Sequence, residues 1–154
     1  MRRMGVLMAV VPLLLLLPTT ASADGVYTSE HIALIPAGGQ PLRTGFVENI
    51  HTNGPVVFAL ERYVLNGASP ATTYQVELHL WIFDATCPGD LSQAQAVLPT
   101  TSFTTNAAGN GIGTGRFSPS DATGLHGLTI GIVWTLSTNG AVAYQTACTD
   151  VVLD

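Results

Sequence analysis

The sequence contains no lysine, and only five of its 154 residues are arginines. Two of these lie at the extreme N-terminus, so the rest of the chain sets ten acidic residues against three arginines, a formal charge of −7. A protein that binds nucleic acid needs cationic side chains to neutralise phosphates, and an anionic membrane surface makes a similar demand. We therefore expect neither nucleic acid nor an anionic membrane to be a partner.

Cysteine is also scarce, because Cys87 and Cys148 are the only two in the chain. In an oxidising compartment the simple expectation for two cysteines is one disulfide. It would close a loop of about 60 residues and contribute ~4 kcal/mol in the chain-entropy model. The alternative is a reactive thiol, which we disfavour because exported free thiols oxidise readily.

Signatures of catalysis and of metal binding are missing as well. The sequence has no H-x-H, H-E-x-x-H or Cys–His cluster and no G-x-S-x-G elbow. We therefore expect no catalytic residues, no cofactor and no metal site, and a hydrolase is the weakest functional alternative. The four scattered histidines are His31, His51, His79 and His126.

The only long apolar run lies near the N-terminus, over residues 5–17. A pair of arginines precedes it, and the Ala-Ser-Ala of residues 21–23 fits the small-residue pattern of a signal-peptidase site. The run is too short to span a bilayer comfortably. We expect residues 1–23 to be a signal peptide, exported by the Sec or the Tat route and cut after Ala23. Residues 24–154 would then form one secreted domain without a membrane span.

Beyond that run, apolar and polar residues alternate with a period of two, and helix signals are almost absent. The clearest strands are "YQVELHLWIFD" (74–84) and "LTIGIVWTLS" (128–137), the second followed by the hairpin signal Asn139-Gly140. Seven or eight short strands separated by turns predict an all-β fold, a single antiparallel immunoglobulin-like Greek-key sandwich. The other candidate strands are 26–35, 44–50, 56–65, 100–105, 112–117 and 141–154.

The segment "NAAGNGIGTG" (106–115) is rich in glycine. Its G-x-G-x-G-x-G spacing, with no helix after it, differs from a dinucleotide-binding fingerprint. It has no carboxylates with which to bind calcium. We interpret the segment as a hairpin loop, with later glycines that let a neighbouring element approach closely.

Two stretches carry a resemblance to known proteins. "GASPATTYQVELHLW", followed by "TTSFTTNAAGNGIGTGRFS", resembles small secreted immunoglobulin-like sandwich proteins of actinobacteria, many of them uncharacterised. The similarity extends distantly to neocarzinostatin-type apoproteins, which carry enediyne chromophores and have two disulfides where this chain can form one. "SPATTY" also resembles the tyrosine corner of such sandwiches. This implies that Tyr74 is buried and that its hydroxyl binds main chain in the preceding "NGASPATT" loop.

The polar side of the strand 74–84 is the main candidate for a functional surface. It carries Glu77, His79, Trp81 and Phe83, opposite a wholly apolar face. Tryptophan and phenylalanine on a polar face predict a surface that stacks on a glycan or packs against a protein. The alternative is that the sheet edge or a long loop covers them, since large apolar side chains are usually buried.

Glu61 and Arg62 interrupt an otherwise apolar strand. Alternation places them on opposite faces, so one of them should be partly buried. Arg62 could be a binding-site arginine, but we favour a structural role in which a paired charge fixes strand register or an edge.

Two classes of function therefore remain open. The leading one is a non-catalytic secreted module that binds an unknown protein or glycan. The alternative is a carrier of a small apolar ligand in a cleft of the sandwich. An exposed aromatic patch would favour the first, and an enclosed apolar pocket would favour the second.

Overall fold

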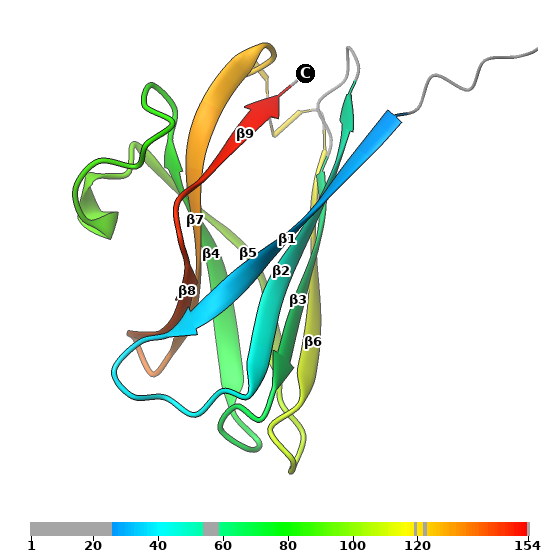
Figure 1. Ribbon diagram of the computed structural model, residues 1–154, viewed down its shortest axis with the longest axis vertical. Helices are drawn as coiled ribbons and strands as arrows, with labels where there is room; N and C mark the ends of the chain where they lie inside the picture. The colour runs from blue at the N-terminus through cyan, green and yellow to red at the C-terminus, as the bar shows by residue number, and fades with distance from the viewer. Residues whose placement is uncertain (1–25, 54–58, 119, 122, 154) are drawn as a thin grey trace, which may run out of the picture.

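The computed structural model describes residues 26–53, 59–118, 120–121 and 123–153. These residues form nine strands and one short 3-10 helix, with no α-helix (Figure 1). No helix in this described part is both long and apolar enough to cross a membrane. The expected signal peptide lies outside the described residues. The elements are β1 (Val26–Pro36), β2 (Thr44–Asn53), β3 (Ala59–Asn66), β4 (Thr73–Trp81), η1 (Leu91–Gln93), β5 (Ala96–Thr104), β6 (Gly111–Phe117), β7 (Leu128–Thr138), β8 (Ala141–Thr146) and β9 (Thr149–Leu153).

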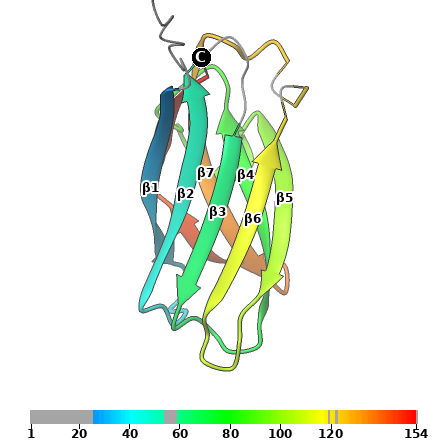
Figure 2. The same cartoon turned by 90° about the vertical axis from the view of Figure 1, so that its right-hand side faces the viewer.

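The strands pair only with antiparallel neighbours, in the order β5-β4-β7-β8-β1-β2-β3-β6, and β9 pairs with β7. They form two facing layers, one of β1, β2, β3 and β6 and one of the remaining strands (Figures 1 and 2). Strand β1 joins the layers, because residues 26–33 pair with β2 and residues 34–36 pair with β8. At the other end of the sheet β5 approaches β6, so the arrangement is close to a barrel. The all-β, antiparallel part of the prediction is confirmed.

The core lies between the two layers and follows the predicted alternation. In β4 the buried set includes Val76, Leu78 and Leu80, and in β7 it includes Ile130 and Ile132. Side chains that point to one face of a strand can all be buried by a single opposing layer. The period-two pattern therefore identified the core face of both strands.

The hairpin between β7 and β8 turns where the sequence predicted it. Asn139 and Gly140 both adopt positive φ, 51° and 75°, as a tight two-residue hairpin turn requires.

The glycine-rich segment forms a tight turn, but the hairpin prediction for it is wrong. The Asn106 side chain caps this turn by accepting from the main-chain N–H of Asn110 at 3.0 Å. The flanking strands β5 and β6 lie in different layers and do not pair with each other. Asn and Gly specify a change of direction, which does not determine whether the flanking strands pair. The predicted close approach does occur, because a Cβ on Gly113 would lie 2.4 Å from the Phe103 ring.

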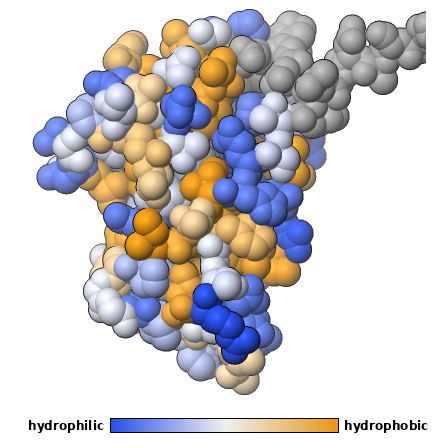
Figure 3. Space-filling model, viewed as in Figure 1, coloured by the Kyte–Doolittle hydropathy of each residue, from blue (hydrophilic) through white to orange (hydrophobic). Residues whose placement is uncertain are grey.

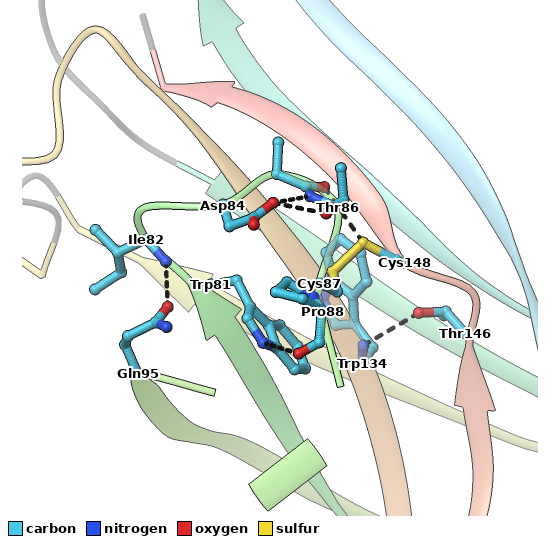
Figure 4. Close-up of a disulfide and its surroundings, with 11 residues drawn as sticks. Trp81, Ile82, Asp84, Thr86, Cys87, Pro88, Gln95, Trp134, Thr146 and Cys148 are labelled. Carbon is cyan, nitrogen blue, oxygen red and sulfur yellow. Dashed lines mark hydrogen bonds between the residues drawn. A yellow bond between two sulfur atoms is a disulfide. The ribbon is translucent and has the colours of Figure 1, made fainter. Parts of the chain in front are cut away.

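The predicted disulfide between Cys87 and Cys148 is present. It ties the segment 82–95, between β4 and β5, to the junction of β8 and β9 (Figure 4). The segment lies directly on β7, since a Cβ on Gly131 would be 2.8 Å from the Cys87 sulfur and 2.9 Å from the Asp84 carbonyl oxygen. The disulfide thus holds this segment, named the disulfide loop below, against the outer face of the β4–β7 layer.

The tyrosine-corner prediction is half right. Tyr74 is fully buried, as expected, but its hydroxyl lies 3.5 Å from the Tyr144 hydroxyl rather than on main chain of the preceding loop. The hydroxyl that donates to main chain is that of Tyr144, which reaches the Pro41 carbonyl at 2.7 Å. The Tyr74 ring packs between the rings of Phe103 and Tyr144, which fixes its orientation in the core.

Candidate functional site

The four residues of the predicted interaction surface do not form one exposed surface. Trp81 is only 1% exposed, whereas Phe83 is 86% exposed. Glu77 and His79 are half-buried. The indole N–H of Trp81 donates to the Pro88 carbonyl at 3.2 Å, so the disulfide loop covers this ring (Figure 4). The sequence left open whether this ring is exposed or covered by a loop, and the structure shows that a loop covers it.

Local hydrogen bonds fix the conformation of the disulfide loop. The Asp84 carboxylate accepts from the main-chain N–H of Thr86 at 2.9 Å, and the Asp90 carboxylate caps η1 by accepting from the Ser92 N–H at 2.9 Å. The Gln95 side chain accepts from the Ile82 N–H at 2.9 Å where the loop leaves β4. These bonds and the disulfide make the loop a fixed cover over Trp81.

The apolar side chains that remain on this side of the molecule are interspersed with polar ones (Figure 3). Protein-binding surfaces are marked by contiguous apolar patches rather than by scattered apolar residues. The face shown in Figure 3 therefore gives no support to a protein-binding surface.

Glu61 and Arg62 do lie on opposite faces of β3, as predicted. Arg62 is exposed on the outer face, where its guanidinium nitrogen lies 3.8 Å from a carboxylate oxygen of Glu48 on β2. An exposed pair at this distance contributes little to stability. Glu61 is the buried member, 1% exposed, and it points between the layers.

Two neutral donors hold the Glu61 carboxyl. Its Oε1 accepts from the indole N–H of Trp134 at 2.8 Å, and its Oε2 accepts from the hydroxyl of Tyr63. The Tyr63 hydroxyl also lies 3.0 Å from the Thr100 hydroxyl. Burial raises the pKa of Glu61 to about 7, and the two hydrogen bonds only partly oppose that increase. Near neutral pH this carboxyl therefore exists in both protonation states.

Further polar side chains lie beside Glu61 on the inward face of the same layer. Strand pairing sets Asn49 directly opposite Glu61, sets Glu30 opposite Asn49, and places His51 one inward position further along β2. Asn49 and His51 are buried, at 3% and 8% exposure. The Nε2 atom of His51 and the Oε2 atom of Glu30 are buried without a hydrogen-bond partner in the described part of the chain. We name Asn49, His51 and Glu61 the polar wall.

A cavity of about 70 Å³, counted as space for the centre of a water molecule, lies against the polar wall. Its other sides are mostly apolar, with Leu78 and Leu80 from β4, Ile130 and Ile132 from β7, and Val151 from β9. One water needs about 10–15 Å³ by this measure, so the cavity can hold several waters or one small molecule. It is therefore a mainly apolar pocket with one polar side.

A wider depression lies on the outer face of the β4–β7 layer, but it is a weaker candidate. It is open to solvent and is lined by short polar side chains such as Thr73, Gln75 and Ser137, all of them at least partly exposed. Ligand sites typically bury most of the ligand among apolar side chains. The cavity at the polar wall fits that description and the outer depression does not. Among the described residues, no group of three His, Cys, Asp or Glu side chains could hold a metal ion.

No protein-family model, no curated protein and no solved structure matches this chain. The resemblance to secreted actinobacterial sandwich proteins and to neocarzinostatin-type apoproteins therefore stays a prediction. Because a fold alone does not specify a function, the function has to be inferred from the site itself.

Sequence reasoning selected Glu61 but assigned it a structural role, and it did not connect Glu61 with Asn49 or His51. One signal was present. In β2 the buried Val47 fixes the inward phase, and Asn49 and His51 follow at alternate positions of that phase. Polar residues on a core face mark either a hydrogen-bond network or a site.

Proposed function

We propose that the protein is a secreted, non-catalytic carrier that binds a small, mainly apolar ligand in the cavity at the polar wall. One observation carries this proposal: His51 lines a largely apolar cavity, and its buried Nε2 atom has no hydrogen-bond partner among the described residues. Buried polar groups in native proteins nearly always have a partner. A ligand with one polar group and an apolar body would supply that partner.

The proposal includes the finer architecture and the location. An immunoglobulin-like sandwich of residues 24–154 is supported by the two antiparallel layers and by the way β1 divides between them. Secretion is supported by the signal-peptide pattern of residues 1–23 and by the disulfide, which is compatible with an extracellular protein.

Binding of a protein or glycan is the second candidate function. It is favoured by Phe83, which is exposed at the start of a loop that hydrogen bonds and a disulfide hold in place. A rigid exposed aromatic ring is a common anchor in such interfaces. Because Trp81 is covered, this candidate has one aromatic residue where the sequence predicted two.

The carrier proposal can be tested with small neutral probes. We expect xenon and 1-butanol, titrated into the whole secreted protein, to shift the methyl resonances of Leu80, Ile130 and Ile132 in a saturable way. Val151→Phe should abolish the effect by filling the cavity. Val97→Phe is the matched control, because Val97 is 45% exposed on β5 and does not line the cavity. Absence of saturable shifts in the wild type, or equal shifts in both variants, would refute the carrier function.

A further inference from the structure

Among the described residues that line the cavity, the charged side chains are acidic. Glu61 is buried there, and Glu30 lies on the same inward face of the β1–β2–β3 layer. Asp121 lies at the rim, where it is exposed and its carboxylate accepts from Ser118. No arginine of the described part of the chain lines the cavity, since Arg62 and Arg116 are exposed on the outward faces of β3 and β6. A low-dielectric cavity lined by a buried carboxyl group and by no arginine favours a positively charged occupant.

The polar wall offers several hydrogen-bond acceptors to an occupant. Each Glu61 oxygen receives one bond from the protein and can accept another. His51 Nε2 has no partner within the described ranges, and it accepts when the ring proton is on Nδ1. Asn49 adds an amide oxygen on the same face. An ammonium group has three N–H donors and no acceptor, so it matches this set.

From this charge and acceptor pattern we propose that the ligand is a small apolar amine, bound with its ammonium group at Glu61 and its hydrocarbon body against the leucines and isoleucines. The proposal rests on the carrier function and names the class of ligand. An anionic ligand would meet like charge at Glu61. A neutral alcohol can bind the polar wall as well, but it gains nothing from an ionised carboxylate.

Binding of an ammonium group requires Glu61 to be ionised, which makes the affinity depend on pH. Burial raises the pKa of Glu61 to about 7, so the empty site loses a proton when the amine binds near neutral pH. The other titratable groups that face it are Glu30 of β1, His51 of β2, Tyr63 of β3 and Asp121 after β6. Of the described inward positions of β4, β5, β7 and β9, only Tyr74 is titratable, and its ring packs between those of Phe103 and Tyr144 rather than lining the cavity.

The test compares two probes of nearly equal size and shape, n-butylamine and 1-butanol, titrated into the whole secreted protein. At pH 8 we expect n-butylamine to bind at least about tenfold more tightly than 1-butanol, as for a charge-assisted bond that replaces a neutral one. Between pH 8 and pH 6 the amine affinity should fall about tenfold, because the ionised fraction of Glu61 falls by about that factor. The affinity for 1-butanol should show no such fall.

Glu61→Gln should remove both the preference for the amine and its pH dependence. Glu77→Gln, on the outward side of β4, is the matched control and should change neither. A measurement on the wild type alone gives a second test, because calorimetry in two buffers of different ionisation enthalpy should show proton release on amine binding at pH 7.

Equal or tighter binding of 1-butanol at pH 8, or unchanged amine binding in Glu61→Gln, would overturn the amine assignment and leave the carrier function standing. Failure of n-butylamine, 1-butanol and xenon alike would overturn both proposals.

Discussion

The buried carboxyl of Glu61 should make the protein less stable as the pH rises. Burial raises its pKa from 4.5 to about 7 in the folded state. Between these two values the folded protein holds a proton that the unfolded chain has lost. The contribution of Glu61 to stability is therefore greatest at low pH and declines as the pH rises from about 4.5 through 7. A shift of about 2.5 pKa units corresponds to about 3 kcal/mol, of which ~2.5 kcal/mol falls between pH 5 and pH 8.

Urea unfolding at pH 5 and pH 8, followed by tryptophan fluorescence, measures this difference. We expect the wild type to lose ~2–3 kcal/mol of unfolding free energy between the two values through Glu61. For Glu61→Gln, the loss of unfolding free energy between pH 5 and pH 8 should be smaller by this ~2–3 kcal/mol, whatever the absolute stability of the variant. Glu77→Gln, which removes a half-buried carboxylate outside the cavity, should keep the wild-type difference. Equal pH dependence in wild type and Glu61→Gln would refute the assignment of a buried, desolvated carboxyl.

Five further substitutions test the architecture around the site. Trp81→Ala should cost about 3–5 kcal/mol of unfolding free energy because the ring is buried. Phe83→Ala should change the unfolding free energy by less than about 0.5 kcal/mol because that ring is exposed. Equal effects of the two variants in urea titrations would argue against the covering loop. Tyr144→Phe should cost about 1–2 kcal/mol, because it removes the donor to a main-chain carbonyl. Tyr74→Phe should cost less, since the hydroxyl contact of Tyr74 is long, and the reverse order would restore the original tyrosine-corner prediction. Cys148→Ser should lower the unfolding free energy by ~2–4 kcal/mol and expose the disulfide loop to protease. An unchanged digestion pattern would show that the disulfide does not hold the loop in place.

The strands and the core were predictable because they depend on local alternation. Leu78 and Ile132 show their inward orientation through their immediate neighbours, and Asn139-Gly140 specifies its turn through backbone conformation alone. The disulfide was predictable because only one pairing of two cysteines exists.

The failures concern features that depend on distant parts of the chain. Trp81 has the outward phase that alternation assigns to it, but the 14 residues between β4 and β5 fold back over it. That return was foreseeable only in outline, from the length of the segment and from the cysteine within it. The predicted hydrogen-bond partner of the Tyr74 hydroxyl was wrong because the packing of three aromatic rings from separate strands decides the orientation of Tyr74.

The candidate site was the least predictable feature. Glu61 and Trp134 meet although 73 residues separate them in the sequence. The polar residues of β2 were visible on the core phase, but the apolar cavity opposite them depends on how the two layers pack. Neither its volume nor the unpartnered atom of His51 can be read from the pattern of one strand.

The central claim is that the cavity at the polar wall is a ligand site, and a crystal structure of the whole protein soaked with n-butylamine tests it most directly. The account predicts density for the probe inside the cavity, with its nitrogen within ~3 Å of a Glu61 oxygen or of His51 Nε2 and its alkyl chain against Leu80 and Ile132. Ordered water alone beside His51, in a cavity that excludes the probe, would contradict it.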